Sequence, residues 1–161
     1  MKTSLTMIAL AFFLMTAAAG ADSQGKVQPD PNDPKKACRG FKPHELCFET
    51  PKDGVARVEY LSEPFYAVIL KTTEPCMITE EERLQTQALF LRSKVFSNRF
   101  QCDDNIEENI AYTNVDSKFG FLAVYAGTTL EEAKKRLAEV NATGRFTGAN
   151  IRKMQAKLLY P

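Results

Sequence analysis

The chain of 161 residues has little of what most enzymes need: it contains one histidine, His44, and no recognised catalytic motif. Gly-x-Ser-x-Gly, a glycine-rich phosphate loop and His-Glu-x-x-His are all missing. Adjacent acids occur at 103–104, 107–108 and 131–132, but such pairs usually solvate a surface or complement a helix dipole. We therefore expect a protein that is not an enzyme, with no catalytic residue and no cofactor.

A long apolar run occurs only at the N-terminus. Lys2 precedes the apolar run Met7–Met15, and small residues continue to Ala21. This is the order of a secretory signal peptide, and the run is too short to span a bilayer, which takes about 20 residues. We predict a signal peptide over residues 1–21 that is cleaved near Ala21, a periplasmic or secreted location, and no transmembrane segment.

A surplus of positive charge is missing as well. The predicted signal peptide contains one basic residue, Lys2, and no acidic one, so 20 of the 21 basic residues remain against 20 acidic residues. Nucleic acids and anionic membranes attract proteins with a basic surplus. The balanced charge therefore argues against nucleic acid as a partner.

Four cysteines follow the predicted cleavage site: Cys38, Cys47, Cys76 and Cys102. In an oxidising compartment an even number of cysteines favours disulfides over metal binding. Three pairings are possible; we favour Cys38–Cys47, which closes a short loop, and Cys76–Cys102, which joins two connections of the main domain. The alternative is a zinc site, but Cys-x-x-Cys spacing is absent and His44 is the only imidazole ligand, so we expect no metal.

Composition divides the rest of the chain into three parts. Residues 22–37 are rich in proline and polar residues, which predicts a flexible tether. Residues 38–62 place a turn signal between the apolar stretches 46–48 and 55–61, which predicts a small disulfide-pinned hairpin. Residues 63–161 are predicted to form the main domain.

The main domain contains two similar strand–helix units. Each helix is predicted to begin at a capping box, Thr79 with Glu82 and Thr129 with Glu132. We expect strands at 65–70, 95–100, 110–115, 119–126 and 149–158 and helices at 79–92 and 129–144. The predicted buried stripes are Leu84, Ala88 and Leu91 in the first helix and Leu130, Ala133, Leu137 and Val140 in the second. Two such units in tandem predict an α+β fold: a βαββαβ domain with a four-stranded sheet and both helices on one face.

The sheet face opposite the helices is the predicted binding surface. Side chains alternate along a strand, and strand 119–126 alternates aliphatic with aromatic residues. We assign its aliphatic residues to the helix side, so Phe121 and Tyr125 point to the other face, where Tyr66 joins them. Exposed aromatic rings receive sugar rings and also mark partner surfaces. In the alternative arrangement, residues 38–61 cover this face and the rings belong to the core.

Polar side chains on neighbouring strands would complete such a surface. Amide and guanidinium groups suit the hydroxyl, acetamido and carboxylate groups of glycans. The candidates are Asn98, Arg99, Asn114, Arg152 and Gln155. From both sets, the predicted glycan-binding residues are Tyr66, Phe121, Tyr125, Asn98, Arg99 and Gln155.

The stretch Phe121-Leu-Ala-Val-Tyr-Ala-Gly-Thr-Thr-Leu-Glu-Glu-Ala resembles the strand, small-residue turn and helix start of the SPOR (sporulation-related repeat) domain. A second match covers 65–70 and 80–84, so the resemblance spans about residues 64–160. It implies a ferredoxin-like fold and binding to the glycan strands of bacterial peptidoglycan. Tyr66 and Phe121 occupy the matching aromatic positions.

Two functions follow as hypotheses. The first is a non-catalytic cell-envelope protein that recognises peptidoglycan glycan strands. The alternative is a secreted or periplasmic protein-interaction module, either an inhibitor or an envelope assembly factor, that meets an envelope protein through a sheet edge or the aromatic face.

Overall fold

The structure is a computed structural model that describes most of the chain beyond the predicted signal peptide. The described residues are 25–27, 38, 40–50, 59–98, 110–116 and 118–159. The predicted signal peptide, Arg99 and Cys102 lie outside these residues, as do nearly all of the predicted tether and the predicted turn at 51–54. None of the helices in the described ranges is long and apolar enough to cross a membrane.

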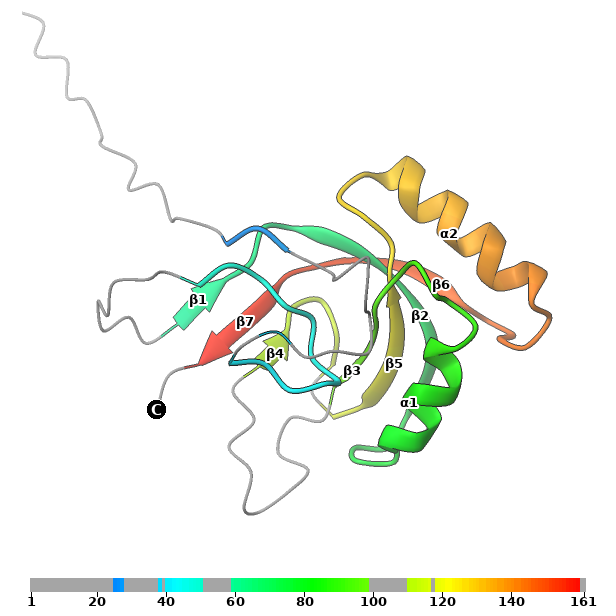
Figure 1. The fold of residues 1–161 in the computed structure, drawn as a ribbon, viewed down its shortest axis with the longest axis horizontal. Helices are drawn as coiled ribbons and strands as arrows, with labels where there is room; N and C mark the ends of the chain where they lie inside the picture. Colours follow the sequence, from blue (N-terminus) through cyan, green and yellow to red (C-terminus); the bar gives the residue numbers. More distant parts are fainter. Residues whose placement is uncertain are drawn as a thin grey trace, which may run out of the picture.

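The chain folds as an α+β protein with two helices and two antiparallel sheets in its described part (Figure 1). In chain order the elements are β1 (Glu59–Leu61), β2 (Phe65–Thr73), α1 (Glu80–Gln87), β3 (Val95–Asn98), β4 (Ile110–Tyr112), β5 (Gly120–Tyr125), α2 (Leu130–Ala142), β6 (Asn150–Met154) and β7 (Ala156–Leu159). The α+β prediction is confirmed. The second sheet was not predicted.

The described strands form two separate sheets that are linked where the chain passes from one to the other. The larger sheet has four strands in the order β3-β5-β2-β6, and the smaller has three in the order β1-β7-β4. The predicted single strand at 149–158 divides at Gln155 into β6 and β7, which belong to different sheets. In the same way, the chain passes from one sheet to the other between β1 and β2, where Ser62 lies. The Ser62 hydroxyl accepts a hydrogen bond from the amide of Ala156 at 2.9 Å. The two sheets are therefore linked at one corner.

The aliphatic residues of β5 face the helices, as predicted. Leu122 and Val124 belong to a buried cluster that also contains Ala133 and Val140 of α2. Phe90, which follows α1, belongs to the same cluster. Both helices thus pack on one face of the four-stranded sheet (Figure 1).

Helix α2 begins as the sequence predicts. The hydroxyl of Thr129 accepts a hydrogen bond from the amide of Glu132 at 3.3 Å, and the Glu132 carboxylate accepts one from the amide of Thr129 at 3.0 Å. The hydrogen bond that the Thr129 hydroxyl donates to the Glu132 carboxylate at 2.9 Å, and then the one from the Thr129 amide, hold the pKa of Glu132 below its ordinary value. In α1 only half of the box forms, because the carboxylate of Glu82 pairs with Lys71 instead, at 2.7 Å.

The predicted buried stripe of α1 is wrong. Leu84 is 41% exposed, Ala88 is exposed and Leu91 is 68% exposed, whereas Arg83 and Gln87 are completely buried. The reason is that α1 ends at Gln87 and not at residue 92. The turns that follow therefore have main-chain groups without helical partners, and these groups need hydrogen bonds from side chains on the inner side of α1. Gln87 supplies them: its amide donates to the carbonyls of Phe90 and Ser93, each at 2.8 Å.

In its described part, the segment before the main domain is not paired as the predicted hairpin requires. Residues 59–61 form β1, which pairs with β7, and Phe48 forms a bridge to Val27. The predicted disulfide Cys38–Cys47 is confirmed. Cys76 is also disulfide-bonded, while its predicted partner Cys102 lies outside the described residues.

Candidate functional site

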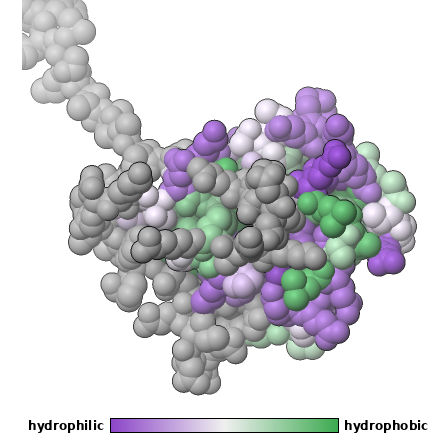
Figure 2. Space-filling view, viewed as in Figure 1, coloured by the Kyte–Doolittle hydropathy of each residue, from purple (hydrophilic) through white to green (hydrophobic). Residues whose placement is uncertain are grey.

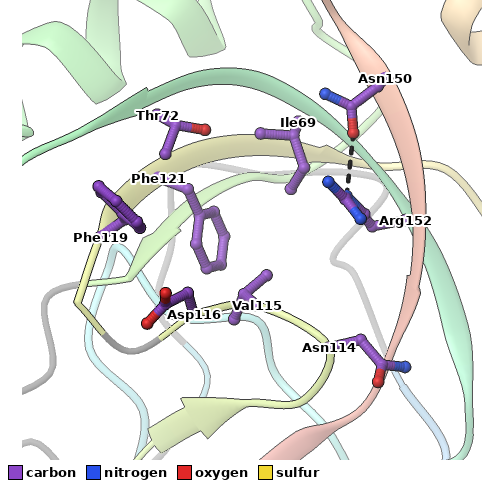
Figure 3. A pocket seen from close by; sticks show the side chains of 9 residues that line it. All are labelled: Ile69, Thr72, Asn114, Val115, Asp116, Phe119, Phe121, Asn150 and Arg152. Atoms are coloured by element: carbon purple, nitrogen blue, oxygen red, sulfur yellow. Dashed lines mark hydrogen bonds between the residues drawn. The ribbon is translucent and has the colours of Figure 1, made fainter.

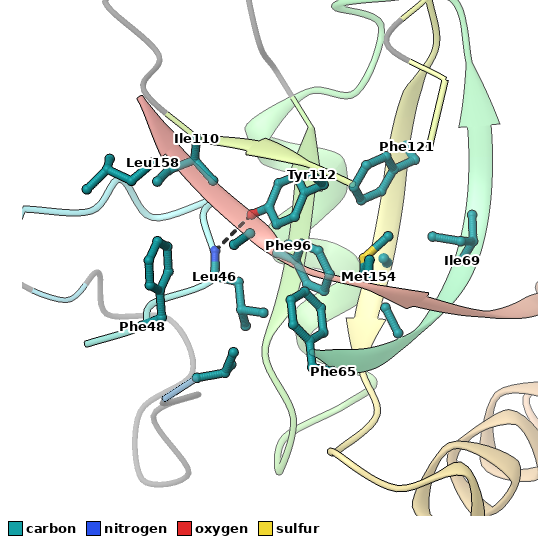
Figure 4. Close-up of a cluster of buried hydrophobic side chains, with 14 of the residues drawn as sticks. Leu46, Phe48, Phe65, Ile69, Phe96, Ile110, Tyr112, Phe121, Met154 and Leu158 are labelled. Atoms are coloured by element: carbon teal, nitrogen blue, oxygen red, sulfur yellow. Dashed lines mark hydrogen bonds between the residues drawn. The ribbon is translucent and has the colours of Figure 1, made fainter. Parts of the chain in front are cut away.

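The predicted aromatic binding face is covered. Phe121 does point away from the helices, but it is only 2% exposed because it lies between the two sheets (Figure 4). Its ring meets the rings of Phe96 and Tyr112 edge-on, with centroids 5.9 and 5.5 Å apart. The segment around Leu46 closes the other side, where the Leu46 amide donates to the Tyr112 hydroxyl at 3.1 Å. Of the two arrangements considered from sequence, the structure has the covered one.

The three predicted rings do not share a surface. Tyr66 packs on the helix side of the sheet, where the ammonium group of Lys153 lies 5.9 Å from its ring centroid. Tyr125 is on the opposite side, half-buried, with its ring 5.9 Å from that of Phe65. Strand β2 is apolar on both faces, so its sequence does not reveal which residues face the helices. The grouping of Tyr66 with Phe121 and Tyr125 was therefore wrong.

Two of the predicted polar companions, Asn98 and Gln155, stabilise the fold. Asn98 is buried at the end of β3. The side-chain amide of Gln155 donates to the carbonyl of Ser62 at 2.8 Å and so helps to fasten the corner between the sheets. Neither residue lies on an open aromatic face.

An open pocket lies instead where β2, β6 and the β4–β5 connection meet (Figure 3). Its volume is about 380 Å³, within the range of small-molecule sites. Ile69, Val115 and the edge of Phe121 form an apolar floor, and the ring of Phe119, 47% exposed, forms one wall. This pocket is the part of the predicted face that remains accessible.

Polar groups surround the apolar floor of the pocket. The guanidinium group of Arg152 lies on β6, where its Nε donates to Asn150 at 3.1 Å (Figure 3). Opposite it, the carboxylate of Asp116 accepts a hydrogen bond from the amide of Lys118 at 2.9 Å. Asn114, with its backbone in the left-handed region at φ 58°, donates to the carbonyl of Lys153 at 2.8 Å. That hydrogen bond holds the β4–β5 connection against β6 and fixes the mouth of the pocket.

A bulge in β2 positions two of the lining residues. The pairing of β2 with β5 shifts between Ile69 and Lys71, so Ile69 lies opposite Ala123 and Thr72 lies opposite Phe121. Ile69 and Thr72, three positions apart, therefore share the face that carries Phe121, which a regular strand does not allow. Both side chains point into the pocket (Figure 3).

A second hollow of about 440 Å³ continues from the first and shares Ile69, Thr72 and Asn150 with it. It extends past the end of β2 toward Arg145 and Phe146, which follow α2. The two hollows together are called the sheet-end groove here. The groove has an aromatic ring near each end and polar side chains between, which suits an extended ligand better than a compact one.

Part of this groove was visible in the sequence. Asn114 and Arg152 were predicted as polar companions of Phe121, and the structure brings these three residues together. Phe119, Asp116 and Asn150 were missed. The alternation of strand 119–126 does place Phe119 on the same side as Phe121, and that was the available signal. The bulge in β2 leaves no comparable mark in the sequence.

Tyr125 has the largest change in acidity of the predicted site residues. Burial, and then the charges of Glu63 and Glu132, raise its pKa from 10.0 to about 12. A raised pKa in the folded state stabilises the fold below the pKa of the unfolded chain, and this contribution is lost as the pH rises toward the folded value. We expect stability to fall between pH 10.0 and about 12, and the variant Tyr125→Phe to lose less. Urea unfolding across this pH range measures the difference; equal slopes for both proteins would contradict it.

No group of three or more metal-binding side chains occurs among the described residues. Comparison of the chain with known protein families, with characterised proteins and with solved structures found no match. The chemistry of the groove itself is therefore the basis for assigning a function.

Proposed function

We propose that the protein is a non-catalytic binding protein of the cell envelope that holds a glycan strand in the sheet-end groove. The observation that carries this proposal is that the exposed Phe119 ring lies across an apolar floor from Arg152 and two asparagine amides (Figure 3). A flat ring receives the apolar face of a sugar. Amide and guanidinium groups bind its hydroxyl, acetamido and carboxylate groups.

The extended form of the groove supports a polymer as the ligand. The two hollows adjoin at Thr72 and Asn150, so neighbouring sugar units have neighbouring places to bind. Peptidoglycan glycan strands, stripped of their stem peptides, are the ligand that the resemblance to SPOR domains implies. The Cys38–Cys47 disulfide supports an oxidising compartment, periplasmic or extracellular.

The proposal includes a finer description of the fold. The four-stranded sheet, with its all-antiparallel order β3-β5-β2-β6 and its helices on one face, supports a ferredoxin-like unit to which β1, β4 and β7 add a second layer. The second layer covers the face on which the resemblance places Phe121. The ligand site is therefore proposed at the rim of that face and not on it.

Phe119→Ala tests the site. We expect the variant to lose at least about tenfold in affinity for amidase-stripped peptidoglycan, because the stacking wall is removed, with an unchanged melting temperature. Leu130→Ala is the matched control, because Leu130 is also an exposed apolar residue, 45% exposed, and lines neither hollow. Co-sedimentation with purified sacculi measures the binding.

Two results would contradict parts of the proposal separately. Equal binding by Phe119→Ala and Leu130→Ala would remove the site assignment. Failure of the unmodified protein to sediment with stripped or intact sacculi would remove the glycan function.

A second candidate function, recognition of an extended peptide, is favoured by the partly open edge of β6. The main-chain groups of Tyr66 bond toward β5, so the opposite residue Lys153 directs its own away from β2, where its carbonyl accepts from Asn114. By the same alternation the main-chain groups of Ile151 also point away from β2, toward the open part of the edge. An added strand at this edge would run beside Arg152 and the pocket. If the protein still captures a protein partner after glycan digestion, and if Phe119→Ala does not weaken that capture, this function is favoured over glycan binding.

A further inference from the structure

The outward side of α1 and its flanking turns exposes a group of large apolar residues. Six large apolar side chains are exposed in the described part of the chain, and four of them lie between residues 77 and 91. These four, the α1 surface, are Met77, Leu84, Leu89 and Leu91. In Figure 2, green apolar residues gather on the α1 side of the molecule between charged ones. Single exposed apolar residues are ordinary, but a group of this kind marks a contact surface.

The orientation of α1 is fixed by its inner side. Arg83 donates to the carbonyl of Val95 at 3.2 Å and pairs with Glu80 at 2.6 Å. Gln87 accepts a hydrogen bond from the amide of Val95 at 2.8 Å. Rotating the helix to bury its leucines would break these bonds and leave buried polar groups unpaired. The leucines therefore stay outside while the chain is a monomer.

Charged residues flank the α1 surface with one sign at each end. Glu81 lies in the first turn of α1, where its carboxylate accepts from Gln85 at 3.1 Å. Arg92 lies beyond the last turn; it is exposed and has no ion pair within the described part of the chain. The surface is thus acidic at one end, apolar in the middle and basic at the other.

We propose that this surface binds a second copy of the chain, with the two α1 helices antiparallel about a two-fold axis. A two-fold axis reverses the order of charges in the partner, so Glu81 of each copy meets Arg92 of the other. The same arrangement pairs the leucines in the middle and sets the two helix dipoles antiparallel, with the positive end of each beside the negative end of the other. A partner of one charge sign, such as an anionic membrane or a basic peptide, would match only one end.

The patch is small, so the dimer forms weakly, with a dissociation constant of about 1–100 µM. Sedimentation velocity over a concentration series measures it directly. We expect Glu81→Arg to weaken dimerisation at least about tenfold, because each copy then presents two basic ends. Combining Glu81→Arg with Arg92→Glu in one chain restores it, because the exchanged charges again match across the two-fold axis. Both residues are exposed, so the two variants keep the parent melting temperature.

Leu91→Glu is expected to abolish the dimer, whereas Leu130→Glu, at an exposed leucine outside the α1 surface, leaves it intact. A protein that remains monomeric at about 100 µM overturns the proposal. So does a dimer that Leu91→Glu leaves unchanged, or one that the charge exchange fails to restore. None of these results depends on glycan binding, because the α1 surface and the sheet-end groove share no residue.

Discussion

Gln87→Leu is expected to lower the free energy of unfolding by about 4 kcal/mol. The side chain of Gln87 is completely buried and makes three hydrogen bonds to main-chain groups, those of Phe90, Ser93 and Val95, each at 2.8 Å. Leucine has a similar size but can form none of them. Each buried group left unpaired costs about 1–3 kcal/mol, only partly offset by the more apolar side chain.

The neighbouring Gln85→Leu is the matched control. Gln85 belongs to the same helix but is exposed, where its amide donates only to Glu81. We expect its replacement to change stability by less than about 0.5 kcal/mol. Urea unfolding of the oxidised protein measures both variants. If Gln87→Leu proved as stable as Gln85→Leu, the polar layer beneath α1 would not be what orients the helix.

This polar layer also explains why the sequence misleads more in α1 than in α2. Both helices show apolar residues at helical spacing, and in α2 the pattern correctly identifies Ala133 and Val140 as buried. Leu130, which was predicted to belong to the same stripe, is 45% exposed because it lies at the first residue of α2, so that part of the prediction was wrong. In α1 the chain stops being helical at Gln87. Leu91 then belongs to a turn, where the period of 3.6 residues no longer predicts its direction. The local pattern is weaker than the requirement that buried main-chain groups be paired.

The sheet illustrates a second limit on what the sequence reveals. Alternation along β5 correctly separates Val124, which faces the helices, from Phe121, which faces away. It contains no information about which distant segment covers Phe121. Tyr112 covers Phe121, and the Leu46 amide in turn bonds to the Tyr112 hydroxyl. The position of Tyr112 depends on the long-range pairing of β4 with β7. Short strands of three residues leave too little periodicity for such pairing to be predicted.

The accessible groove depends on the same long-range pairing. Phe119 and Asn114 come from the β4–β5 connection and Arg152 comes from β6, and they meet only because that connection is held against β6. Their chemistry was predictable, since aromatic, amide and guanidinium groups were all singled out as glycan ligands. Their meeting place was not, because it is created by the bulge in β2 and by the division of the last strand at Gln155.

Phe121→Ala is expected to destabilise the fold by about 4 kcal/mol, as truncation of a buried phenylalanine usually does. The ring fills the space between Phe96 and Tyr112, and the covering layer cannot collapse freely because it is fixed by strand pairing and by the Leu46–Tyr112 hydrogen bond. Thermal unfolding measures the loss, for which we expect a melting temperature lower by about 10 °C or more.

The comparison of Phe121→Ala with Phe119→Ala locates the ligand. The two rings are two residues apart on one side of the chain, yet Phe121 is 2% exposed and Phe119 is 47% exposed. We expect Phe119→Ala to lose glycan binding at full stability. Phe121→Ala, assayed well below its own melting temperature, is expected to retain at least part of the binding, because only the edge of its ring reaches the groove floor. The reverse result, in which Phe121→Ala keeps its melting temperature and loses all binding, would mean that the sheet face opens in solution and that the ligand binds there.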